Sequence, residues 1–103
     1  MNSHGKGSDK NAALYRALLT LKTPEECYAF FEDLCTVSEQ MAMEQRFEVA
    51  MLLDQGSIYN DVLEKTGVSS ATVSRVKRCL NYGAGGYRQV LDRLAEEPPE
   101  EGA

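Results

Sequence analysis

The chain has 103 residues, of which 43% are hydrophobic and 26% are charged, and this composition is typical of one soluble globular domain. Its longest unbroken apolar run, residues 49–53, is far shorter than the roughly 20 residues of a membrane span, and residues 1–13 lack the apolar segment of a secretory signal. Three cysteines without a CxxC pair, and a single His, predict reduced thiols in a cytoplasmic protein and no zinc site.

Apolar residues recur at helical spacing from the start of the chain, and no segment alternates with the period of two that is typical of strands. A first helix is predicted over residues 11–21. Thr23 and Glu26 then form a capping box, with Pro24 at the first helical position, for a second helix that carries an apolar stripe as far as residue 35.

A third helix is predicted from about residue 39 to residue 55. Either Thr36 or Ser38 is suited to cap it, and Gly56 is suited to end it. After two further helices, described below, a sixth is expected over residues 87–95. The chain should therefore be one all-α domain over residues 11–95, between a flexible tail at 1–10 and an acidic tail at 96–103.

The stretch from residue 57 to residue 82 has the layout of a helix-turn-helix. Ser57 is expected to cap a helix over residues 58–65, Ser69 is expected to cap a helix over residues 70–81, and Gly67 supplies positive φ in the turn between them. Leu63 stands where most such motifs carry Ala. Apolar residues occupy the positions where the two helices must pack, namely Val62, Val68, Val73 and Val76.

The second helix of this motif combines small side chains with positive charge, which is the combination that DNA recognition requires. Its first turns carry side chains small enough to approach base edges directly or through water: Ser70, Ala71, Thr72 and Ser74. Arg75, Lys77 and Arg78 follow and can meet phosphates, while the helix N-terminus at Ser69 adds backbone donors.

The formal net charge of −5 does not exclude DNA as a partner, because the acidic residues lie elsewhere. Residues 57–82 carry +2, whereas residues 24–56 carry −7. At a Debye length of about 8 Å, charges so far away are largely screened. We expect a DNA-binding transcriptional regulator. The acidic block leaves open an alternative, a helix-turn-helix module that binds protein and does not read DNA sequence.

An enzyme is not expected. The sequence contains no pairing of a nucleophile with a base, no cluster of metal ligands, and no glycine-rich phosphate loop beside a strand.

Three segments, "LKTPEECYAFFEDLCTVSE", "QRFEVAMLLDQG" and "TGVSSATVSRVKRCLNYG", resemble the tryptophan-repressor family, and most closely its YerC/YecD-like branch. Together they cover about residues 20–90, and members of this family also lack Ala at the position of Leu63. The resemblance implies an intertwined homodimer that represses transcription at a palindromic operator. Its two recognition helices would enter successive major grooves about 34–36 Å apart.

The resemblance also implies a corepressor pocket, in which two arginines sandwich an indole. The matching positions are Arg46 and Arg75, together with Thr36, while Cys79 replaces a pocket Ser. Val76 stands where the repressors have Gly, and its branched side chain would reach toward the space of the indole. We therefore expect no tryptophan corepressor and leave another small-molecule effector open. Arg46 could instead pair with a nearby carboxylate, and phosphate is the first expected partner of Arg75.

Overall fold

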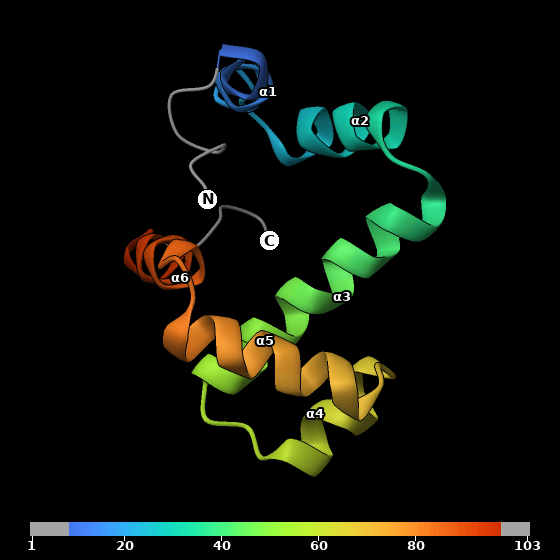
Figure 1. Ribbon diagram of the computed structural model, residues 1–103, viewed down its shortest axis with the longest axis vertical. Helices are drawn as coiled ribbons and strands as arrows, with labels where there is room; N and C mark the ends of the chain where they lie inside the picture. The colour runs from blue at the N-terminus through green and yellow to red at the C-terminus, as the bar shows by residue number, and fades with distance from the viewer. Residues whose placement is uncertain (1–8, 98–103) are drawn as a thin grey trace. The chain divides into compact units, whose positions relative to one another are not determined.

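The computed structural model describes residues 9–97, which form six helices and no strand within that range (Figure 1). In chain order the helices are α1 (Asp9–Leu18), α2 (Pro24–Leu34), α3 (Val37–Asp54), α4 (Tyr59–Thr66), α5 (Ser70–Tyr82) and α6 (Gly86–Glu96). The all-α prediction is confirmed. The chain divides into two compact units, residues 1–40 and 41–103, with α3 passing from one into the other. Most of the expected tails at residues 1–10 and 96–103 lies outside the described residues, whereas α1 already begins at Asp9 and α6 extends to Glu96.

The predicted capping box at the start of α2 forms in part, because Thr23 caps the helix and Glu26 bonds to the residue before the cap. The Thr23 side chain accepts a hydrogen bond from the Glu26 N–H at 3.1 Å. The Glu26 carboxylate reaches back to accept from the Lys22 N–H at 2.9 Å, one residue before the cap. One of the donors that a helix start leaves without partners, the Glu26 N–H, is thereby satisfied, and α2 begins at Pro24.

The start of α3 resolves the two alternatives for its cap in favour of Thr36. The Thr36 side chain accepts from the Glu39 N–H at 3.1 Å, and the Glu39 carboxylate accepts from the Thr36 N–H at 2.8 Å. This reciprocal pair satisfies two donors, so the helix begins at Val37, two residues earlier than the sequence suggested.

The first unit leaves its apolar residues accessible. No residue of α2 is buried, although Phe30 and Phe31 contact each other edge to face with ring centroids 5.8 Å apart. Over residues 12–40 the buried residue is polar: Gln40 donates from its side-chain amide to the Tyr28 carbonyl at 3.4 Å. Within its described residues, the first unit therefore has an apolar stripe on α2 and no buried apolar core beneath it.

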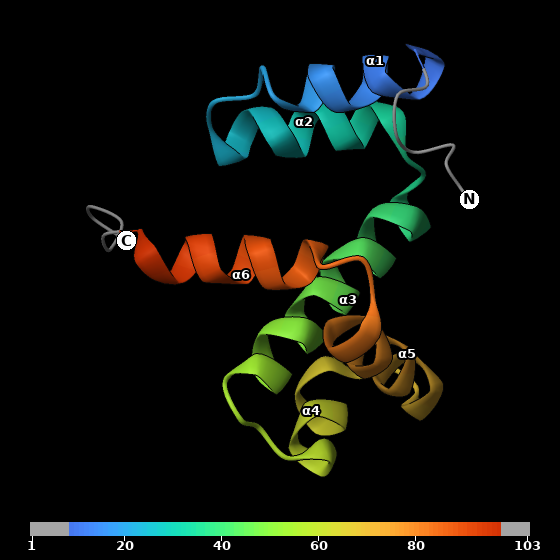
Figure 2. The ribbon, with the colours of Figure 1, turned by 60° about the vertical axis from the view of Figure 1, so that its left-hand side comes forward.

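The second unit contains the whole buried apolar core of the described residues. Its members come from four helices and are Val49, Ala50, Val62, Val73, Val76 and Leu91. Figure 2 shows α4 and α5 gathered against the C-terminal half of α3, where this core lies. Three valines that the helix-turn-helix pattern placed at packing positions, Val62, Val73 and Val76, are fully buried, whereas Val68 is half-buried.

An arginine fork connects α6 to the end of α3. Arg88 donates to both carboxylate oxygens of Asp54, at 2.8 and 3.0 Å, and to Asp92 of its own helix at 3.0 Å. The hydrogen bonds from Arg88 lower the pKa of Asp54 from its usual value. A carboxylate at the C-terminal end of a helix lies beside the negative end of the helix dipole, so the guanidinium offsets an otherwise unfavourable position.

The prediction that Ser57 caps α4 is wrong. The helix begins at Tyr59, its N-cap is Ile58, and no side chain hydrogen-bonds to the helix start. Ser57 instead completes the end of α3, where its N–H donates to the Leu52 carbonyl at 3.0 Å around Gly56, which has φ of 92°. This backbone bond fixes Ser57 one residue before the capping position.

Within residues 9–97, none of the helices has the length and apolar character that a membrane crossing would require.

Candidate DNA-binding surface

The turn between α4 and α5 depends on the backbone freedom of Gly67. Gly67 has φ of 72° and ψ of 9°, the left-handed conformation that side chains with a Cβ rarely adopt. Its N–H donates to the Leu63 carbonyl at 2.9 Å and so closes the end of α4. The sequence predicted this role for Gly67, and the structure confirms it.

Thr66 is a second determinant of the turn, and the sequence analysis did not identify it. Its buried hydroxyl donates to the Val62 carbonyl at 2.7 Å and accepts from the Val68 N–H at 3.4 Å. One side chain thus connects the last turn of α4 to the first residue beyond Gly67. The sequence feature that could have indicated this role is a Thr at the end of a helix, because a Thr hydroxyl can hydrogen-bond to the carbonyl four residues earlier.

Ser69 caps α5 as predicted. Its side chain accepts from the Thr72 N–H at 3.1 Å, and the Ser69 and Thr72 hydroxyl oxygens are also 3.1 Å apart. Thr72 is half-buried, and its hydroxyl is hydrogen-bonded to the capping hydroxyl of Ser69. Among the four small residues expected near base edges, Ser70, Ala71 and Ser74 are the exposed ones.

Burial on one side of α5 leaves its other side accessible. Val73 and Val76 are 0% and 1% exposed, and they pack with core residues of α3 and α4. The three cations expected to meet phosphates, Arg75, Lys77 and Arg78, are all exposed. Among the described residues, none of these three forms an ion pair with a carboxylate, so their charge is available to an external anion.

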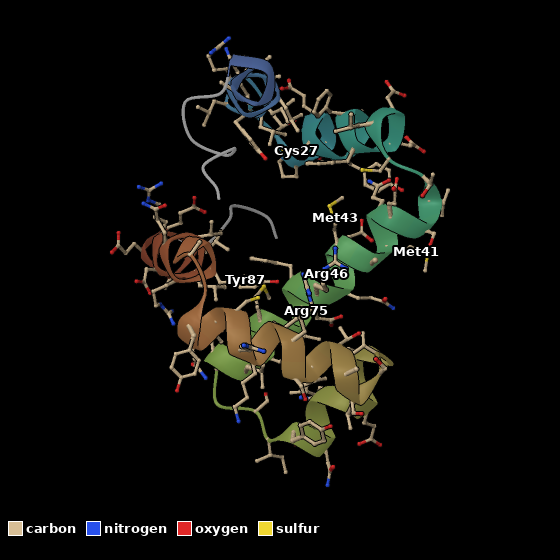
Figure 3. All side chains as sticks on the ribbon, in the orientation of Figure 1. Cys27, Met41, Met43, Arg46, Arg75 and Tyr87 are labelled. Atoms are coloured by element: carbon tan, nitrogen blue, oxygen red, sulfur yellow. The ribbon has the colours of Figure 1, made fainter. Side chains whose placement is uncertain are left out.

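Arg46 and Arg75, the two expected ligand-binding arginines, flank the contact between α3 and α5 (Figure 3). Arg46 lies one helical turn before the buried Val49, and Arg75 immediately precedes the buried Val76. Neither arginine is hydrogen-bonded to a carboxylate within residues 9–97. Thr36, the third expected pocket residue, belongs to the first unit, where its side chain is occupied in capping α3.

Cys79, which replaces a Ser of the implied corepressor pocket, is exposed. Cys79 lies one turn beyond Val76 at the edge of the buried face, where it borders an open apolar groove of about 480 Å³. Phe47 and Tyr87 form part of the groove, with ring centroids 6.4 Å apart. The lining residues are Phe47, Cys79, Gly83, Ala84, Gly86, Tyr87 and Val90. Neither Arg46 nor Arg75 contributes to this lining.

A left-handed glycine turn, a serine-capped second helix and an exposed cationic face on that helix together define a helix-turn-helix protein. The comparison with known families agrees, because the family model described as Trp repressor protein matches residues 10–95. The chain belongs to the Trp repressor family, which is a family of DNA-binding regulators and not of enzymes.

Relatives within this family cover nearly all of the described residues. The uncharacterised protein YerC of Bacillus subtilis (strain 168) is 51% identical over 87 residues, which are 84% of each chain. A TrpR-like protein from Eubacterium eligens ATCC 27750 is 46% identical, with a TM-score of 0.85 over 95% of this chain and 100% of that one. A protein from Staphylococcus aureus, described as a candidate Trp repressor, is 41% identical with a TM-score of 0.85, over 96% of this chain and 99% of that one.

Removal of the Ser69 cap of α5 should destabilise the protein, whereas removal of the Ser57 side chain, which caps no helix, should not. Ser69→Ala deletes the acceptor for the Thr72 N–H and should lower the free energy of unfolding by about 1 kcal/mol. Ser57→Ala is the matched control, because no hydrogen bond from its side chain caps a helix, and it should change stability by less than about 0.5 kcal/mol. Urea denaturation of both variants measures the difference, and equal losses would contradict the assigned cap.

Proposed function

We propose that this protein is a dimeric, sequence-specific DNA-binding regulator that represses transcription from a palindromic operator in the bacterial cytoplasm. The observation that carries the proposal is the difference between the two faces of α5. The valines of one face are buried in the core, and the opposite face presents Ser70, Ala71 and Ser74 beside cations that form no ion pair among the described residues. Small polar groups at the start of a recognition helix can read base edges, and cations farther along it can bind the flanking phosphates.

A second copy of the chain is the partner that this structure favours. Among the residues that the structure describes, the buried apolar ones all belong to the second unit, while the first unit exposes large apolar side chains such as Leu19 at 85% and Leu34 at 51%. A helix with an apolar stripe gains most of its stability by packing that stripe against another surface. The groove beside Tyr87 and Val90 is one such surface, and in a symmetric pair each copy supplies both surfaces to the other.

Two-fold symmetry of the protein explains the palindromic operator. Each copy would present one α5 to one half-site, and half-sites one helical turn of DNA apart, about 34–36 Å, would be contacted from the same side of the duplex. Since each copy offers few cations, non-specific affinity should be modest and both half-sites should be needed for tight binding.

We also propose that tryptophan is not the corepressor of this protein. The side chain of Val76 is 1% exposed and fills space between α3 and α5, next to Arg75. An indole between Arg46 and Arg75 would need space beside that side chain, and a steric conflict in a closed pocket costs kilocalories. An effector of another shape remains compatible with the two unpaired arginines.

Removal of a recognition-helix cation should weaken DNA binding regardless of sequence. Lys77→Ala should lower affinity for genomic fragments and for random competitor alike, and reduce the salt slope by about one for each cation lost. Arg93→Ala removes the same charge from α6 and should leave both quantities unchanged. Mobility shifts at several salt concentrations measure them. If the wild-type dimer binds no fragment better than random DNA at low salt, the protein is better described as a protein-interaction module.

A charge placed in the groove should dissociate the dimer. Val90→Asp puts a carboxylate where the partner copy is proposed to pack, and it should shift sedimentation from twice the chain mass of 11.4 kDa to a single chain. Gln89→Asp adds the same charge to the adjacent exposed position of α6 and should remain dimeric. A wild-type protein that sediments as a monomer at all concentrations would refute the proposed assembly.

Tryptophan should leave both the stability and the DNA affinity of this protein unchanged. A ligand that binds the native state raises the melting temperature, and the rise grows with the ratio of the free ligand concentration to its dissociation constant. We therefore expect no change in melting temperature across a titration of L-tryptophan, and no change in a mobility shift with genomic fragments. A rise in melting temperature that grows with the L-tryptophan concentration would overturn this proposal and leave the DNA-binding proposal intact.

A further inference from the structure

Tyr82 is the most exposed aromatic residue in the described part of the chain, with 85% of its surface accessible. It is the last residue of α5, it does not line the groove, and it is absent from the core of the second unit. Isolated exposed apolar residues are common on protein surfaces, so accessibility alone assigns no role to this side chain. Its position on the helix is more informative.

Tyr82 falls on the same line along α5 as the residues proposed to contact DNA. Residues three or four apart share one face of a helix. Successive steps of three, four and four residues connect Ala71 to Ser74, Arg78 and Tyr82, and all four residues are exposed. The buried Val73 and Val76 lie on the other side of α5. The face that the proposed function assigns to DNA therefore continues to the final residue of the helix.

The length of α5 places the two ends of this face in different parts of a DNA groove. Its 13 residues span about 20 Å, whereas the major groove is about 12 Å wide and 8.5 Å deep. Recognition helices present their N-terminal residues to the bases. When Ser70 and Ser74 lie against base edges, the last turn of the helix lies beside the phosphates that form the wall of the groove.

We propose that the Tyr82 hydroxyl donates a hydrogen bond to a phosphate oxygen of the bound DNA. This inference rests on the proposed function and adds a contact at the C-terminal end of α5. Tyrosine hydroxyls are among the donors that proteins use toward phosphate. The last turn of α5 contains no basic residue, so Tyr82 supplies a neutral donor at a position without a cation.

A neutral contact has a signature that distinguishes it from the neighbouring cations. Loss of a cation changes both the affinity and its dependence on salt, because fewer counterions are released on binding. Loss of a hydroxyl should change the affinity and leave the salt slope as it was. Because phosphates carry no sequence information, the change should be the same for any duplex.

The test compares Tyr82→Phe with wild type, with Arg78→Ala and with Tyr15→Phe. The probe is a duplex of arbitrary sequence several helical turns long, and binding is followed by fluorescence anisotropy at several salt concentrations. Tyr82→Phe should weaken binding about threefold to tenfold with an unchanged salt slope, whereas Arg78→Ala should also reduce the slope by about one for each cation lost. Tyr15→Phe removes the same hydroxyl from α1, where the side chain is 54% exposed, and should bind like wild type.

Three results would overturn the phosphate contact while leaving DNA binding established. They are wild-type affinity in Tyr82→Phe, a loss of affinity restricted to genomic fragments that the protein prefers, and a loss that coincides with dissociation of the dimer in sedimentation. The last result would assign the hydroxyl to the partner copy. A wild-type protein that binds no duplex would refute the proposed function, and this contact with it.

Discussion

Burial of one valine face of α5 determines what the second unit can present to a partner. Val73 and Val76 pack with Val49 and Ala50 of α3, and each is almost inaccessible to water. Full burial of a valine contributes roughly 1.5–3 kcal/mol, more than a typical surface hydrogen bond. The rotation of α5 about its axis is therefore set by the core. Helix geometry then directs the residues half a turn away toward solvent, whatever their chemistry.

Hydrogen bonds at the turn determine where that rotated helix begins. Gly67 ends α4 in a conformation that other residues rarely adopt, Thr66 connects its last turn to the following residue, and Ser69 satisfies a donor at the start of α5. Rotation alone would leave the helix free to start one residue earlier or later. Because the cap and the core favour the same start, Ser70 is exposed in the first turn, the position from which the proposed function has it contact base edges.

Features that depend on a few consecutive residues could be predicted from the sequence, and features that depend on distant contacts could not. The caps at Thr23 and Ser69 and the positive φ of Gly67 follow from local chemistry, and the structure confirms all three. Ser57 is a residue type that often caps helices, but its backbone N–H is used to end the preceding helix. The N-cap preference therefore fails where two helices need the same residue. The exposure of Cys79 depends on how α3, α5 and α6 meet, which no local pattern contains.

Val76 connects the stability of the recognition helix to the question of its control. The same side chain that orients α5 is the neighbour of Arg75, and under the proposed function it stands in the way of a flat ring. On that proposal a helix oriented by permanent packing binds DNA without a ligand, so no fraction of the protein is withheld in an incompetent state. On this proposal, operator occupancy follows the concentration of the dimer, because two half-sites bound together raise the affinity far above that of one. Control would then act on the amount of protein or on the groove where the copies meet.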